Sequence, residues 1–231
     1  MKKLFFPALV FVLAISLISK SPPSSNTTTR PETSSVYVLI ENGGTVDEQD
    51  QPAALDAINH LMQQLSELER RRATRDTDIH IVLSTLPNRI AWSGKPEALL
   101  QDVEVIQQLT AFKPTFSDLV MSMSQISTTI DLNPTDETTL IWLGPTVHVP
   151  FQETSEDIQV QVPQDIPPEL ALPNFADRLT ALKVYGVHPD QDEKLQDYFR
   201  NIGVLSRAST GELDFRLLGP AQTKGNLSNL L

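Results

Sequence analysis

Three residues that can transfer protons follow apolar runs of this sequence. Glu41 comes directly after the run VYVLI, His148 comes shortly after TLIWL, and His188 follows LKVYGV. If these runs are parallel strands, their carboxyl ends meet at one edge of a sheet, where ligands usually bind. A carboxylate and an imidazole brought together there can act as general acid and base. One hypothesis is therefore a hydrolase that uses Glu41 with His148 or His188.

The sequence lacks the patterns of several other chemistries. It contains no cysteine, which excludes disulfides, thiolate metal sites and a cysteine nucleophile. Neither nucleotide-binding glycine pattern, G-x-G-x-x-G or G-x-x-x-x-G-K-[ST], is present, and no G-x-S-x-G turn of a serine hydrolase occurs. We therefore expect no nucleotide cofactor and no catalytic serine of that type.

Alternating strand and helix patterns must position the polar residues. The runs at 36–40 and 139–143 are rich in β-branched and aromatic residues, which is typical of buried strands. Residues 51–72 repeat apolar side chains at helical spacing behind Asp50, a good N-cap. The same criteria predict strands at 78–84, 89–92, 182–187 and 215–218, and helices at 96–112, 116–130 and 190–202, the last with Asp190 and Glu193 as a capping box.

The order of these elements predicts an α/β fold. Alternation of strands and helices favours a doubly wound, mostly parallel sheet with helices on both faces. Residues 78–92 resemble a hairpin, so we expect one antiparallel edge strand. Residues 151–173 contain four prolines and an acidic patch and are interpreted as an insertion, and residues 220–231 as a tail.

The first residues of the chain predict export. Residues 1–20 join a basic start, MKK, to an apolar stretch of signal-peptide length that is short for a membrane span. We interpret them as a signal peptide or an N-terminal anchor, which places the rest of the chain outside the cytoplasm, as a periplasmic, secreted or membrane-anchored protein. Residues 21–35 are rich in serine, threonine and proline and predict a flexible spacer.

The charge of the chain narrows the choice of partners. The formal net charge is −11 at pH 7. An acidic surface repels phosphate backbones and anionic lipid head groups. We therefore expect no nucleic-acid partner, and contact with a membrane only through the predicted N-terminal anchor.

The predicted element order resembles that of von Willebrand factor type A (VWA) domains over residues 36–219. The resemblance rests on the hairpin at 78–92 and on the strand–helix–strand ending between residues 182 and 217. It also rests on the segment PTFSDLVMSMSQI, in which a Ser-Asp-Leu turn opens a helix. The resemblance implies a ligand-binding face at the carboxyl ends of the strands.

VWA domains that bind ligands through a metal ion use D-x-S-x-S after the first strand, a threonine from a later loop, and an aspartate after the fourth strand. A hard divalent cation needs such oxygen ligands and a carboxylate that offsets its charge. Here the first pattern keeps a longer carboxylate and the last hydroxyl but loses the central ligand, and no acid follows the run TLIWL. The resemblance thus implies a degenerate site with the candidate residues Glu41, Gly43, Thr45, Thr115, Ser117 and Asp118.

The sequence therefore predicts a VWA-like module that binds another protein or a cell-surface polymer without catalysis. We expect it to need no cofactor and to bind no Mg²⁺ or Mn²⁺. Gly43 and Gly44 are predicted to supply positive φ angles in the turn after the first strand. Two alternatives remain: the hydrolase described above, in exported form, and a structural component of an envelope assembly.

Overall fold

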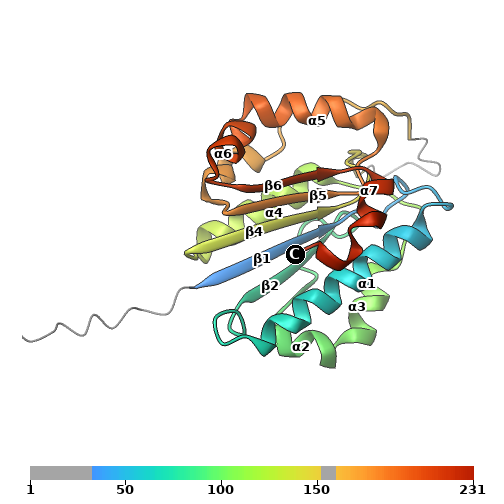
Figure 1. Cartoon of the computed structure of the whole chain (residues 1–231). Coiled ribbons are helices and arrows are strands. Elements are labelled where there is room, and N and C mark those ends of the chain that lie inside the picture. Colours follow the sequence, from blue (N-terminus) through green and yellow to red (C-terminus); the bar gives the residue numbers. More distant parts are fainter. Residues whose placement is uncertain (1–32, 152–159) are drawn as a thin grey trace, which may run out of the picture. The chain divides into compact units, whose positions relative to one another are not determined.

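The computed structural model describes residues 33–151 and 160–231 of the chain (Figure 1). The predicted signal peptide or anchor at 1–20, nearly all of the predicted spacer at 21–35, and residues 152–159 of the predicted insertion lie outside the described residues. None of the helices in the described ranges combines the length and apolar character that a membrane crossing requires.

Six strands form one sheet in the order β3-β2-β1-β4-β5-β6. All neighbouring strands are parallel except β2 and β3, which are antiparallel. This confirms the predicted α/β class with one antiparallel edge strand. The strands are β1 (Ser34–Ile40), β2 (Asp78–Leu83), β3 (Trp92–Gly94), β4 (Glu137–Leu143), β5 (Ala181–Tyr185) and β6 (Asp214–Leu218).

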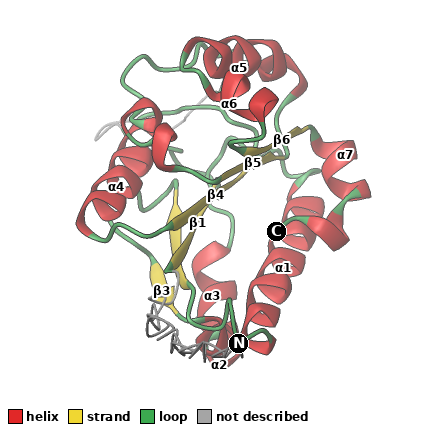
Figure 2. Cartoon of the chain, turned by 60° about the vertical axis from the view of Figure 1, so that its left-hand side comes forward, coloured by secondary structure: helices red, strands yellow, loops and turns green. Residues whose placement is uncertain are grey.

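Helices cover both faces of the sheet, as the alternating pattern predicts (Figure 2). The α-helices are α1 (Gln51–Glu67), α2 (Pro96–Gln101), α3 (Val103–Thr110), α4 (Leu119–Leu132), α5 (Pro189–Asn201), α6 (Val204–Thr210) and α7 (Pro220–Gly225). Short 3-10 helices are η1 (Leu68–Arg70), η2 (Leu172–Asn174), η3 (Ala176–Arg178) and η4 (Leu227–Asn229).

The alternation of side chains along β1 divides the core into two layers. Tyr37 and Leu39 point to the face covered by α4, α5 and α6. Val36, Val38 and Ile40 point to the face covered by α1, α2 and α3. Because β1 is buried on both faces, its sequence is an unbroken apolar run.

Several predicted elements begin or end elsewhere. Helix 96–112 is divided at Asp102, whose carboxylate accepts a hydrogen bond of 2.9 Å from Trp92 Nε1. The edge strand lies at Trp92–Gly94 rather than at 89–92, because its register pairs Trp92 with Ile81 and buries the indole against α2. Helix α5 is capped by His188, whose Nδ1 accepts from the backbone N–H of Asp190, so Asp190 is not the cap.

The sequence also misplaced both ends of the folded region. Ser34 and Ser35, assigned to the spacer, belong to β1, and Ser35 Oγ lies 2.8 Å from Thr135 Oγ1. Residues 220–231, predicted to be a tail, form α7 and η4 instead. Leu230 in this segment is fully buried beside Tyr185, whose hydroxyl donates to the Leu230 carbonyl over 2.9 Å. Leu227 and Leu230 pack against the core layer that contains α1, so the segment covers part of that layer.

Candidate functional site

Glu41 lies at the carboxyl end of β1 and is the buried centre of the candidate site, with 1% of its surface exposed. Its Oε1 accepts hydrogen bonds from Trp142 Nε1 at 2.7 Å and from the Thr146 backbone N–H at 2.8 Å. Its Oε2 accepts from the Val147 backbone N–H at 3.3 Å. The carboxyl group therefore joins the end of β1 to the end of β4 and to the loop that follows β4.

Burial also sets the charge of this group. Loss of water raises the pKa of Glu41 to about 8, although the hydrogen bonds from Trp142, Thr146 and Val147 act in the opposite direction. At neutral pH the carboxyl group is therefore mainly protonated and uncharged. A neutral carboxylic acid attracts a cation much less strongly than a charged carboxylate does.

The loop after β4 is shaped around Glu41. Gly144 has φ = 150°, and a Cβ added to it would lie 2.4 Å from Glu41 Cβ. Thr146 has φ = 64°, which is uncommon for a residue other than glycine. Its N–H donates to Glu41 in this conformation. The carboxyl group thus holds a strained backbone in place.

Gly43 and Gly44 do not have the positive φ angles that the sequence predicted. They are needed for a close approach instead. A Cβ on Gly43 would lie 2.5 Å from the Phe116 carbonyl oxygen, and the Gly44 N–H donates to the Thr115 carbonyl over 2.7 Å. The two glycines therefore bring the loop after β1 directly against the loop that precedes α4.

The hydroxyl groups of the predicted degenerate site come from the loop after β1 and the loop before α4. Ser117 Oγ is buried without a hydrogen-bond partner. The Thr45 hydroxyl is also buried and meets no partner with regular hydrogen-bond geometry, but it lies close enough to Glu41 to lower the pKa of that carboxyl group. Thr115 Oγ1 makes only a long contact of 3.5 Å with the neighbouring Phe116 carbonyl. Asp118 caps α4, since its Oδ1 accepts from the Met121 N–H at 2.9 Å. Thr115 and Asp118 thus make their contacts near their own positions in the chain, whereas Thr45 faces Glu41.

These residues do not fit a divalent metal. Threonine and serine hydroxyls are suitable ligands, but the carboxyl groups beside them are engaged: Glu41 is neutral at pH 7 and accepts three N–H donors, and Asp118 accepts from the Met121 N–H. No cluster of three His, Asp or Glu residues with metal-binding geometry occurs in the described part of the chain. A hard cation requires charged oxygen ligands that are free to turn toward it.

The two histidines of the hydrolase hypothesis make hydrogen bonds away from Glu41. His148 Nδ1 accepts from the Leu119 N–H at 3.2 Å, and burial lowers the pKa of its imidazole. His188 Nδ1 accepts from the Asp190 N–H at 3.2 Å. The Glu41 carboxyl group accepts hydrogen bonds from Trp142, Thr146 and Val147, with the Thr45 hydroxyl nearby. The fold therefore does not join these residues into an acid–base pair.

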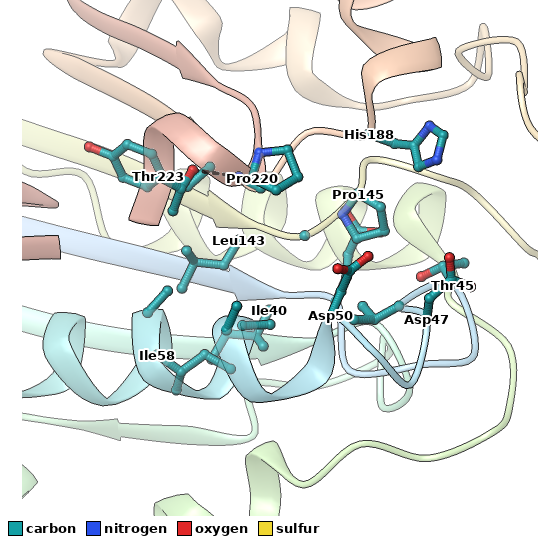
Figure 3. Close-up of a pocket in the computed structure, with 18 of the residues that line it drawn as sticks. Ile40, Thr45, Asp47, Asp50, Ile58, Leu143, Pro145, His188, Pro220 and Thr223 are labelled. Carbon is teal, nitrogen blue, oxygen red and sulfur yellow. Dashed lines mark hydrogen bonds between the residues drawn. The ribbon is translucent and has the colours of Figure 1, made fainter. Parts of the chain in front are cut away.

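A cavity of about 350 Å³ opens beside Glu41, at the carboxyl ends of β1, β4 and β5. In an open α/β sheet, such a position is the usual place for a ligand. Figure 3 shows an apolar end with Ile40, Ile58 and Leu143, and a polar end with Asp47 and His188. The C-terminal helix α7 supplies one side of the cavity, through Pro220, Thr223 and Lys224.

The sequence alone did not identify several residues of this site. Trp142, Gly144 and Thr146 complete the surroundings of Glu41, and only the Gly-Pro turn after the TLIWL run hinted at them. The sequence pattern did not single out Asn42 either. Its amide donates to the carbonyls of Leu109 and Ala111 and so attaches the loop after β1 to the end of α3.

Comparison with known proteins supports the fold and leaves the family open. No protein-family model matches this sequence, and no curated protein sequence matches it significantly. Among solved structures, a mutant of the PilB minor pilin from Streptococcus sanguinis has 9% sequence identity and a TM-score of 0.54, with 88% of this chain and 62% of the pilin covered. The pilus adhesin SpaC from Lactobacillus rhamnosus GG, in an open conformation, has 10% identity and a TM-score of 0.50.

This chain spans only part of both proteins: the match covers 87% of this chain but 30% of the adhesin. At these identities the likeness concerns the fold alone. Together with the strand order and the antiparallel edge strand, it defines a VWA-like α/β domain.

Proposed function

We propose that this domain is a non-catalytic binding module that recognises another protein or a surface polymer at the carboxyl edge of its sheet, without a divalent metal ion. One observation carries the proposal. Glu41 stands where the VWA resemblance implies a metal-binding aspartate, yet it is buried, neutral at pH 7, and hydrogen-bonded to three N–H groups. The edge keeps the shape of a VWA recognition face but has exchanged the cation for an internal hydrogen-bond network.

The similar solved structures support the same role. One is described as a minor pilin and the other as a pilus adhesin. A protein of that kind acts outside the cytoplasm, which agrees with the export signal predicted in residues 1–20. We therefore place this domain outside the cytoplasm, carried by the predicted signal peptide or anchor and separated from it by the spacer.

The residues that can touch a partner differ from those that the sequence singled out. Glu41 and Ser117 are buried and act only through the loops that they shape. The exposed side chains of this edge include Asp47 and Lys113, and the half-exposed Phe151, whose ring packs edge-on against Phe116. We name the surface formed by Asp47, Lys113 and Phe151 the carboxyl-edge face.

Affinity capture from an envelope fraction tests this function. The double variant Asp47→Lys, Phe151→Ser is compared with a matched control at the amino edge, Asp76→Lys, Leu132→Ser, which changes one exposed acid and one exposed apolar residue. We expect the first variant to lose at least tenfold of the captured partner, and the control to resemble the wild type. Capture should also survive EDTA.

Two outcomes contradict the proposal. One is loss of capture in the amino-edge control while the carboxyl-edge variant still binds. The other is loss of capture in EDTA with recovery on addition of Mg²⁺ or Mn²⁺.

A further inference from the structure

The cavity beside Glu41 has an apolar interior and an acidic rim. Its interior is formed by side chains from β1, α1 and β4, among them Ile40, Ile58 and Leu143. At the polar end, Asp47 and Asp50 line the cavity, and both residues are exposed (Figure 3). Within the described part of the chain, neither carboxylate makes a side-chain hydrogen bond or an ion pair. The rim therefore presents two unpaired negative charges.

The start of each neighbouring helix also disfavours an anion. Helices α1, α5 and α7 begin beside this cavity, and helix N-termini ordinarily bind anions through free N–H groups. Here each first turn contains a proline, Pro52, Pro189 or Pro220, which has no N–H. The free N–H in the first turn of α5 donates to His188 instead. A phosphate or carboxylate would find few donors and two carboxylates.

We infer that this cavity binds an alkylammonium group, namely the side chain of a lysine on the protein partner, with its methylenes among the apolar residues and its ammonium at Asp47 and Asp50. The inference rests on the proposed binding function and specifies its partner chemistry. Lysine is the residue that joins a long apolar stem to a compact positive charge. A cavity of about 350 Å³ lies within the size range of ligand pockets.

In the part of the chain that the structure describes, the positively charged groups near the cavity do not pair with its acidic rim. Lys224 is the lysine of this chain that lines the cavity among the described residues, and it follows Thr223 on α7. Figure 3 places Thr223 at the end of the cavity far from Asp47. His188 lies at the polar end, where its Nδ1 accepts a hydrogen bond from the Asp190 N–H. Within the described residues, no ion pair joins Lys224 to Asp47 or Asp50, so both carboxylates can meet a cationic ligand.

The test is a titration of the whole protein with three small probes, followed by NMR of the backbone amides. The probes are n-pentylammonium, n-pentanol and n-pentanoate, which share one chain and differ in charge. We expect n-pentylammonium to shift signals of residues around the cavity and to bind at least fivefold more tightly than n-pentanol. We expect n-pentanoate to bind more weakly than n-pentanol.

Variants assign the effect to the cavity. Asp47→Asn with Asp50→Asn should reduce n-pentylammonium binding to the level of n-pentanol and leave n-pentanol unchanged. The control Asp56→Asn with Glu67→Gln removes two acids from α1 outside the cavity, and should keep the preference. Ala54→Leu, which fills the cavity from the partly exposed face of α1, should weaken all uncharged and cationic probes.

Four results overturn the inference. The first is no binding of n-pentylammonium when the probe is at millimolar concentration, in roughly 50-fold molar excess over the protein, and the second is binding of n-pentanoate as tight as that of n-pentylammonium or tighter. The other two are an unchanged preference for n-pentylammonium over n-pentanol in the Asp47→Asn, Asp50→Asn variant, and signal shifts confined to residues away from the cavity. A well-dispersed spectrum of each variant confirms that it is folded. If the probes fail while the carboxyl-edge face still captures a partner, only this inference falls and the proposed function stands.

Discussion

At the scale of single residues, one methylene group changes what the first loop does. Glu41 is longer than the aspartate that the VWA resemblance implies at this position, and its carboxyl group reaches Trp142 on β4 and the backbone of Thr146. Its hydrogen bonds come from donors within the chain itself. The loops around the site are then held by hydrogen bonds that the chain makes for itself.

The charge of Glu41 leads to a prediction about pH. Its pKa is near 4.5 in the unfolded chain and about 8 in the folded protein. The stability that the neutral acid contributes is therefore complete below pH 4.5 and is lost as the pH rises through about 8. Over this window, the free energy of unfolding should fall by at most about 1.4 kcal/mol for each pH unit because of this group.

Glu41→Gln removes this dependence, since an amide keeps the shape and cannot ionise. We expect urea unfolding between pH 5.5 and 9 to show the variant less stable than the wild type at low pH, with the difference shrinking as the pH rises. The titration of His80 and His148, whose pKa values burial lowers, is common to both proteins and cancels in the difference. A difference that stays constant with pH would refute a raised pKa at Glu41.

The close approach of Gly144 to Glu41 gives a second prediction at this scale. Gly144→Ala should cost about 3 kcal/mol or more of unfolding free energy, because its Cβ meets the Glu41 side chain and its φ is unsuited to a side chain. Gly203→Ala is the matched control. Gly203 also has a positive φ, 81°, but a Cβ there meets nothing within 4 Å. We expect it to cost about 1–2 kcal/mol in the same urea experiment.

At the scale of elements, the C-terminal segment is part of the fold. Leu227 and Leu230 pack against the layer that contains α1, and Gln64 on α1 accepts from the Leu230 N–H over 2.9 Å. Leu230→Ala should therefore destabilise the protein by about 2–5 kcal/mol, the usual cost of truncating a buried leucine. Leu132→Ala, at a position that is 74% exposed, serves as the control and should change stability by less than about 0.5 kcal/mol in chemical denaturation. Equal stability of both variants would mean that the segment is detached.

The sequence predicted the elements whose pattern is local and missed those that depend on tertiary contacts. β1 and β4 were recognised because burial on both faces makes their sequences continuously apolar. The break at Asp102 follows from a hydrogen bond with Trp92, which no periodicity reveals. The C-terminal segment is short and polar apart from its leucines, so only its contact with α1 and Tyr185 identifies it as structured.

The surroundings of the candidate residues could be predicted only in part. The carboxyl ends of β1 and β4 do meet. The close approach of Gly43 and Gly44 to the loop before α4 was not predicted. The reason for the glycines was wrong, because spatial closeness of Phe116 cannot be read from a turn sequence. The burial of Glu41 depends on how Trp142 and the strained Thr146 close over it, and this too lies beyond sequence patterns.

At the scale of the whole molecule, thermal unfolding tests the proposal that the domain needs no metal ion. A ligand present at about 1,000 times its Kd stabilises a protein by about 4 kcal/mol, which would raise the melting temperature of a domain of this size by roughly 10 °C. We expect 1 mM Mg²⁺ or Mn²⁺ to change the melting temperature by less than about 1 °C, relative to NaCl of equal ionic strength. A rise of several degrees that Glu41→Ala removes would show that the degenerate site still binds a cation.

The burial of Leu230 has a practical consequence for how the protein can be attached to a surface or a dye. A linker added after Leu231 starts one residue from Leu230. The side chain of Leu230 is fully buried, and its backbone N–H and carbonyl are both hydrogen-bonded. A force applied at that point acts on α1 through the hydrogen bond between Leu230 and Gln64, and on α7, which lines the cavity. Single-molecule or biosensor work should therefore immobilise the protein through an exposed position at the amino edge, such as Asp76, where attachment leaves the carboxyl-edge face turned toward the analyte.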